Sequence, residues 1–117
     1  KKMRNKKIIV MGDFNVLPSL LDVDPQLLEQ DKRNGLLVGE METDFMKQLV
    51  ELGFVDPFRL MYPQMRKYTY WNQTSGDRQR NQGKRLDYAL IELKMWENEE
   101  VLDCVIRTDI YGSDHCP

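Results

Sequence analysis

Residues 8–15 read IIVMGDFN, and this stretch decides the expected fold. Its first four residues are a continuous apolar run rich in β-branched side chains, which predicts a strand buried on both faces. Gly12 ends the run, and Asp13 and Asn15 follow two positions apart. Residues at that spacing in an extended chain project to one side, and a carboxylate beside an amide suits a hard cation or an attacking water. An Asx-type turn after the strand explains the same residues without chemistry.

Outward from this stretch, strand and helix patterns alternate, which indicates α/β layering. Residues 40–52 are the best helix candidate, because Met41, Phe45, Leu49 and Leu52 recur at near-helical spacing, and Gly53 then follows as a stop. The remaining segments are assigned by pattern: strands at 68–71, 85–92 and 101–107, a new element at 54–57, and loops at 16–35 (with a helical turn after Pro25), 72–84 and 112–117.

Composition fits one soluble domain, since the chain has 117 residues, of which 41% are apolar and 31% charged. Two cysteines and one histidine are too few for a disulfide scaffold or a Cys/His zinc site, and they indicate a reducing compartment. A net charge of −2 argues against a protein that coats nucleic acid. The sequence starts just before a strand and stops at a proline in a loop, which suggests a piece of a larger unit.

The segment KRLDYAL, residues 84–90, places Asp87 between Leu86 and Tyr88 in an apolar strand. An inward-facing carboxylate at this position is costly unless it has a partner. The alternative is an edge-strand aspartate that faces water.

The segment GSDHCP, residues 112–117, contains the only histidine of the chain. Imidazole is the usual general base, and a carboxylate often holds its tautomer. Neighbouring side chains point in different directions, so Asp87 rather than Asp114 is the expected partner of His115; a purely structural histidine is the alternative. The set of Asp, Asn and His residues, without a nucleophilic Ser or Cys elbow, suits metal-assisted hydrolysis by water.

Two features suggest nucleic acid, each with a plainer reading. The aromatic side chains at 68–71 could stack on bases, although core packing explains them too. The basic side chains of Arg78, Arg80, Lys84 and Arg85 could contact phosphates, although a solvated loop explains them equally well.

GDFN, RLDY and GSDHCP, in this order, resemble the second half of the endonuclease/exonuclease/phosphatase superfamily. Residues 54–63, the YTYW stretch and the G-x-R-x-x-N-x-G-x-RLDY run at 76–88 are similar to exonuclease III-type apurinic/apyrimidinic (AP) endonucleases. The resemblance covers nearly the whole chain and is weakest at 16–39. It implies a four-layer α/β sandwich of which residues 1–117 form the C-terminal half, without the first half and the last strand.

The resemblance also implies roles for single residues. Asp13 would activate the attacking water or stabilise the metal and leaving group, and Asn15 would position the phosphate. His115, held by Asp87, would contact the scissile phosphate as base or electrophile. Asp114 and Asp13 would bind Mg²⁺, for which Mn²⁺ can substitute.

The implied partner is duplex DNA with an abasic site, together with the missing N-terminal half, and no membrane. The implied DNA-binding residues are Trp71, Arg78, Arg80, Asn81, Lys84 and Arg85, although Lys84 replaces a tryptophan common in this branch. The expected activity is incision 5′ to abasic sites in base excision repair, with 3′ exonuclease or phosphodiesterase activity, and residues 1–117 alone are expected to be inactive. Other nucleases, lipid or nucleotide phosphatases, and an inactive DNA-binding or scaffold module are the alternatives. The expected location is intracellular: the nucleus of a eukaryote, otherwise the cytoplasm, or an organelle.

Overall fold

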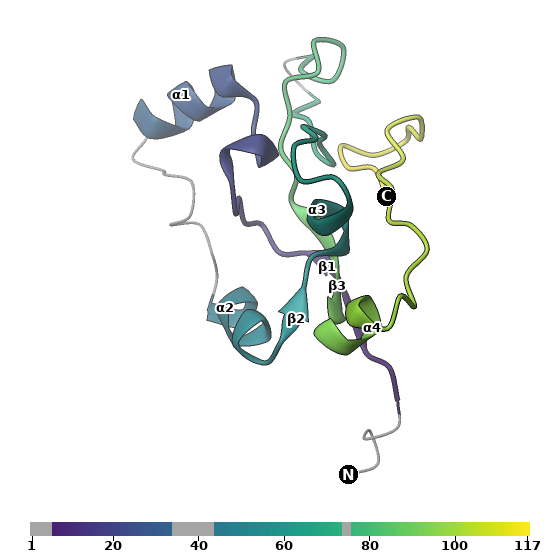
Figure 1. Ribbon diagram of the computed structural model, residues 1–117. Helices are drawn as coiled ribbons and strands as arrows, with labels where there is room; N and C mark the ends of the chain where they lie inside the picture. Colours follow the sequence, from purple (N-terminus) through teal and green to yellow (C-terminus); the bar gives the residue numbers. More distant parts are fainter. Residues whose placement is uncertain (1–5, 34–43, 74–75) are drawn as a thin grey trace.

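The computed structural model describes residues 6–33, 44–73 and 76–117. Its centre is a three-stranded antiparallel sheet in the order β1–β3–β2 (Figure 1). The strands are β1, Ile9–Asp13; β2, Phe54–Val55; and β3, Asp87–Glu92. β1 pairs with β3 along its whole length, from Ile9 opposite Ile91 to Asp13 opposite Asp87. This register brings the carboxyl end of β1 beside the start of β3.

Short helical segments join and flank these strands. Within the described residues they are η1, Leu20–Asp22; α1, Pro25–Arg33; α2, Asp44–Glu51; α3, Pro57–Met61; and α4, Leu93–Glu97. α3 begins with Pro57 in its first turn, and the Asp56 side chain caps it by accepting a hydrogen bond from the backbone N–H of Arg59 at 3.4 Å. None of these helices is long and apolar enough to cross a bilayer.

The expected strand at 8–11 is confirmed as β1, but its burial on both faces is wrong for the described residues. Ile9 is 54% and Met11 is 71% exposed, whereas Val10 packs against the core cluster that contains Leu90. β1 lies at one side of the sheet with β3 as its neighbour, and only one of its faces is covered. An apolar run therefore marks the strand here without requiring two covered faces.

The helix predictions need two corrections. Residues 16–33, the described part of the expected loop at 16–35, are not irregular, because η1 begins after a capping box at Ser19. The helical turn expected after Pro25 continues through nine residues as α1. The helix expected at 40–52 is confirmed as α2, with Met41 outside the described residues. Its buried face holds Leu49, as expected, with Met46, whereas Leu52 lies beyond the helix end and is 75% exposed.

Of the other predicted strands, 85–92 is confirmed as β3, and 54–57 becomes β2 and the start of α3. Residues 68–71 form no ladder: Tyr70 makes isolated bridges to Lys84 and to His115. The carbonyl oxygen of Lys84 accepts from the N–H groups of both Thr69 and Tyr70, at 2.9 Å each, so pairing does not continue along the chain. Among the described residues, 101–107 belongs to no strand, so that prediction is wrong. The four-layer sandwich remains a prediction for the whole domain.

A buried ion-pair network ties the start of β3 to two other segments. Arg85, which is 2% exposed, donates from Nε to Asp22 Oδ1 at 2.7 Å and from Nη2 to Asp56 Oδ2 at 2.6 Å. Arg59 Nη2 donates to the same Asp22 oxygen at 2.7 Å. Buried charges persist in proteins when they are paired in this way. The network joins the segment after β1, the start of α3 and the residues just before Asp87.

Candidate active site

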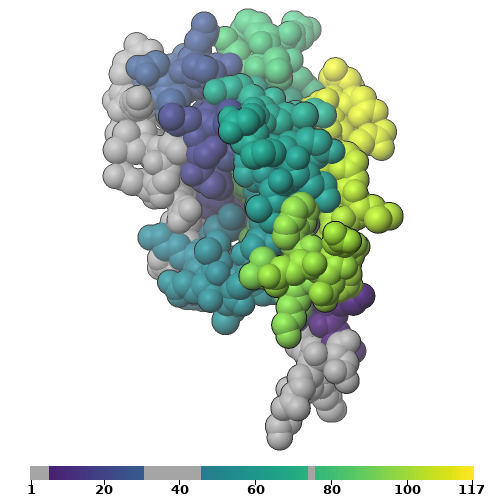
Figure 2. Space-filling view, viewed as in Figure 1, coloured from purple at the N-terminus to yellow at the C-terminus, as the bar shows by residue number. Residues whose placement is uncertain are grey.

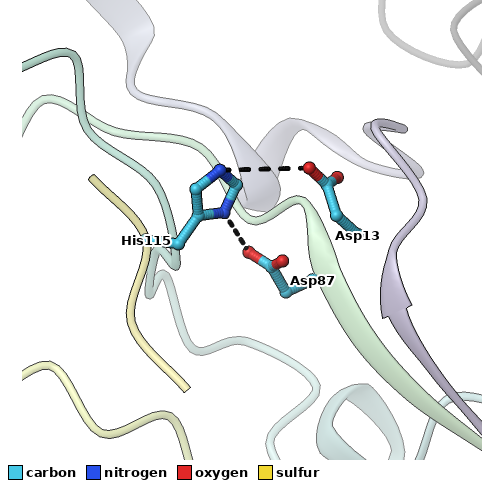
Figure 3. Close-up of side chains that lie close together, drawn as sticks. All are labelled: Asp13, Asp87 and His115. Atoms are coloured by element: carbon cyan, nitrogen blue, oxygen red, sulfur yellow. Dashed lines mark hydrogen bonds and ion pairs between the residues drawn. The ribbon is translucent and has the colours of Figure 1, made fainter. Parts of the chain in front are cut away.

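Asp13 and Asp87 are directly opposite each other in the β1–β3 ladder. Side chains of opposed residues share one face of a sheet, and two like charges at that position repel each other. A cationic or hydrogen-bonding group between them would relieve this repulsion. His115 lies at that place, although it is distant in the sequence (Figure 3).

The segment at 69–71 positions His115 through backbone hydrogen bonds on both sides of it. The N–H of Trp71 donates to the carbonyl of Asp114 at 3.0 Å, and the N–H of Cys116 donates to the carbonyl of Thr69 at 2.8 Å. The Thr69 hydroxyl oxygen also accepts from the N–H of Asp87 at 3.2 Å. Thr69 therefore contacts both the loop that bears His115 and the first residue of β3.

The two nitrogens of His115 have different partners. Nδ1 lies 2.8 Å from Asp87 Oδ2, and because a carboxylate only accepts, Nδ1 must donate its proton to Asp87. Nε2 lies 3.9 Å from Asp13 Oδ2 and 4.0 Å from Asp114 Oδ1. The expected pairing of Asp87 with His115, with Asp13 close by, is confirmed, and it fixes which nitrogen can face a substrate.

Partial burial alone would lower the pKa of His115, but the opposing effects are larger in sum. The hydrogen bond and charge of Asp87, followed by the charges of Asp114 and Asp13, raise the pKa of His115 above its ordinary value of 6.5. The imidazolium form therefore persists to higher pH than in a free histidine.

Asn15 forms a turn directly after β1. Its backbone N–H donates to Asp13 Oδ1 at 2.8 Å, and its φ of 52° lies in the left-handed region that asparagine tolerates. The Asx-type turn is thus present, and it also holds Asp13, whose other oxygen is the one near His115. The exposed side chain of Asn15 remains available to a ligand.

Carboxylate oxygens of Asp13 and Asp87 and a ring nitrogen of His115 lie within 4.8 Å of one another. Such a donor set could hold a divalent cation, and hard cations such as Mg²⁺ prefer oxygen ligands. Asp87 already accepts from His115, whereas Asp13 and Asp114 flank Nε2 with side chains that are 46% and 47% exposed. The donor set that the structure brings together does not include Asp114, so metal binding by the two exposed carboxylates of Asp13 and Asp114 remains a prediction.

Comparison with known proteins places this geometry in a family. The family model described as "Endonuclease/Exonuclease/phosphatase family" matches residues 1–115. The chain belongs to this family. The exodeoxyribonuclease of Bacillus subtilis is 34% identical over 97% of this chain and 44% of its own length. Recombination repair protein 1 of Drosophila melanogaster is 40% identical over 96% of this chain and 16% of its own length. The solved AP endonuclease of Leishmania major superposes with a TM-score of 0.70 at 29% identity, over 92% of this chain and 32% of that one. This chain therefore spans less than half the length of these relatives, and most of it superposes on part of the Leishmania structure.

Two of the six residues that the sequence predicts to bind DNA are buried in the protein. Trp71 is 2% exposed, its Nε1–H donates to Asn81 Oδ1 at 3.2 Å, and a Cβ at Gly83 would lie 2.6 Å from that nitrogen. Arg85 is equally buried in the ion-pair network. Both side chains are almost wholly covered by protein here, which favours packing roles, and contact with DNA by either one remains a prediction.

The other four expected DNA-binding residues differ in their surroundings. Arg80 pairs with Asp77 at 2.9 Å. Because its side chain is 56% exposed, it can also contact a phosphate of DNA. Lys84 is half-buried and bridges Tyr70, and Asn81, although exposed, accepts from Trp71. Arg78 contacts the loop before His115, as considered below. The structure brings Asp13, Asp87, Asp114 and His115 together and places Asn15 in the turn next to Asp13. The expected DNA-binding residues lie in the 72–84 segment or directly beside it.

Sequence reasoning missed Thr69 and Asp22. Thr69 is 2% exposed, and its hydroxyl holds the start of β3; the alternation of threonine with aromatics in YTYW was the signal for an inward hydroxyl. Asp22 is 0% exposed within LLDV, the same apolar setting that drew attention to Asp87. A buried carboxylate needs a partner, and applying that argument to Asp22 would have indicated an ion pair.

Proposed function

We propose that this chain provides the hydrolytic site of a Mg²⁺-dependent DNA repair nuclease that cleaves the phosphodiester 5′ to an abasic site. The alignment of Asp87, His115 and Asp13 is the observation that supports it most (Figure 3). Relatives named as an exodeoxyribonuclease, a recombination repair protein and an AP endonuclease support DNA as the substrate. We include 3′ exonuclease and 3′ phosphodiesterase activity, because those reactions hydrolyse the same type of bond.

The positions of the side chains support the role that we propose for each. Asp87 holds the ring of His115 through Nδ1, so that Nε2–H faces the site and donates to a phosphate oxygen. This donation favours the transition state, in which negative charge develops on that oxygen. Asp13, 3.9 Å from Nε2, accepts a proton from the attacking water, and the exposed amide of Asn15 orients the phosphate.

Asp13 and Asp114 are the residues that would hold Mg²⁺. A bound Mg²⁺ supplies charge neutralisation at the phosphate and lowers the pKa of a bound water. Both carboxylates are exposed beside Nε2, so this arrangement leaves Asp87 to orient the histidine.

We further propose that the full-length protein contains the other half of a four-layer α/β sandwich. This chain spans 44% of the Bacillus relative, and one face of β1 is exposed at Ile9 and Met11. The remaining half would supply further metal ligands and DNA contacts. We place the reaction wherever the cell keeps its DNA: the nucleus, the cytoplasm of a prokaryote, or an organelle.

The test uses the full-length protein and a labelled duplex with one tetrahydrofuran abasic analogue. We expect incision on the 5′ side of the analogue with Mg²⁺ or Mn²⁺, no incision in EDTA, and no phosphate release from inositol phosphates. Hydrolysis of inositol phosphates without DNA incision would assign the site to a phosphatase, and incision that persists in EDTA would refute the metal requirement.

A further inference from the structure

The guanidinium of Arg78 makes cation–π contacts with two aromatic rings. Its central carbon lies 4.4 Å from the centroid of Trp71 and 4.0 Å from that of Tyr111. Trp71 is buried at 2% exposure and Tyr111 is 74% exposed, so these contacts run from the interior to the surface. Arginine pairs well with aromatic faces because its charge is delocalised and weakly hydrated.

The edge of the same guanidinium donates to three carbonyls of the loop that precedes the histidine. Nη2 donates to the carbonyls of Thr108 at 3.1 Å and Ile110 at 2.6 Å, and Nη1 donates to that of Ser113 at 3.4 Å. These bonds span 30 to 35 residues of sequence. They therefore fold the loop back on itself immediately before Asp114 and His115.

Trp71 links these contacts to the site directly. Its ring lies under Arg78, and its backbone N–H donates to the carbonyl of Asp114 at 3.0 Å. The indole is fixed in turn by Asn81. Displacement of Arg78 would leave the loop held only by the backbone bonds at Trp71 and Cys116, and these bonds would then open more often.

We propose that Arg78 is a positioning residue for His115 and Asp114, and that it acts through the 107–115 loop rather than through a DNA phosphate. Its guanidinium contacts two aromatic rings, and Nη2 donates to two loop carbonyls, so its interactions are made largely within the protein. This inference rests on the proposed function and deepens it, because it assigns the geometry of the hydrolytic site to a residue outside that site.

The first test compares Arg78→Ala with Arg107→Ala in the full-length protein. Arg107 is an exposed arginine of the same loop whose side chain pairs with Asp109 at the surface, so it is a matched control. Displacing reactive groups by about 1 Å can reduce rate on the order of 10²-fold. We expect Arg78→Ala to lower single-turnover incision of the abasic duplex by about 10- to 100-fold with an unchanged Kd for DNA. Arg107→Ala should retain the wild-type rate.

Chemical rescue separates a positioned guanidinium from a general loss of folding. Ethylguanidinium should restore part of the rate of Arg78→Ala by occupying the place of the lost guanidinium, and ethylammonium at equal ionic strength should not. A second variant, Tyr111→Ala, removes the exposed ring while keeping Arg78, and it should lower the rate in the same direction with Kd unchanged.

Hydrogen exchange supplies a measurement that does not depend on activity. The amides of Trp71 and Cys116, which bond the loop that bears His115, should exchange faster in Arg78→Ala than in Arg107→Ala. Unchanged exchange at both amides would overturn the positioning role even if the protein incised no DNA. Parallel losses of rate and DNA affinity would overturn it too, by making Arg78 a DNA contact. A wild-type protein that fails to incise abasic duplex while exchange responds as expected would refute the proposed function alone.

Discussion

Replacing Asp22 by asparagine should destabilise the fold strongly, because this side chain neutralises two arginines in the interior. Asp22 is 0% exposed and accepts from Arg59, from Arg85 and from the backbone N–H of Ser19 at 3.1 Å. Removing one partner of a buried ion pair costs about 3–5 kcal/mol. Asparagine keeps the shape and Asp56 still pairs with Arg85, so we expect the lower end, about 3 kcal/mol of unfolding free energy.

The assay is urea unfolding at equilibrium of full-length Asp22→Asn, with Asp109→Asn as the control. Asp109 also pairs with an arginine, Arg107, but their side chains are 65% and 54% exposed, and such surface pairs contribute little. We expect a clear fall in the midpoint urea concentration for Asp22→Asn, an unchanged m value, and no measurable shift for Asp109→Asn. Equal shifts for the two variants would refute the reasoning that burial makes the Asp22 network strong.

Three further outcomes are expected. In metal-free buffer, Asp87→Asn should lower the pKa of His115. This pKa is measured from the NMR signal of the His115 ring, which is assigned by its loss in His115→Ala. Because the folded pKa is raised, protonated His115 stabilises the fold fully below pH about 6.5 and loses this effect as pH rises through the raised value; an unaltered pKa would contradict the pairing. Arg80→Ala should reduce the slope of log affinity against log salt by about 0.9 if it makes one phosphate contact, and an unaltered slope would assign Arg80 to a solvated loop. Residues 1–117 alone should self-associate through the exposed face of β1 and show no Mg²⁺-dependent incision; a monodisperse fragment that cuts abasic DNA would show that this reading of a half-domain is wrong.

The pairing of the polar site residues could be predicted in part from the sequence, because the local pattern around a motif limits where its polar side chain can lie. A carboxylate inside an apolar strand needs a partner, which pointed from Asp87 to the single histidine. Side chains two positions apart in an extended chain share a side, which grouped Asp13 with Asn15. The structure instead ends β1 at Asp13 and joins Asn15 to it through a turn, so strand alternation does not place the Asn15 side chain. These arguments depend on short-range geometry, and they needed no knowledge of how the loops run.

The surroundings of the site could not be predicted, because they depend on long-range packing. A sequence shows that Arg78 and Arg85 are charged, but it does not show whether a guanidinium meets solvent, a carboxylate or an aromatic ring. The 101–107 segment has strand-like composition, yet pairing requires a neighbouring strand, and the described residues provide none there. Similarly, the stretch after Val16 has no helical period that would reveal η1, because the Ser19 cap and the buried Asp22 determine this short helix.

The central claim is that His115, held by Asp87, acts on the scissile phosphate rather than in binding DNA. The most direct test is single-turnover incision of the abasic duplex by full-length His115→Ala in Mg²⁺, with the Kd for the same duplex measured in EDTA. Positioned proton donors and bases contribute about 10²–10⁴-fold, so we predict a rate loss of that size with unchanged DNA affinity. A His115→Ala protein that incises at nearly the wild-type rate, or that loses affinity and rate together, would contradict the account.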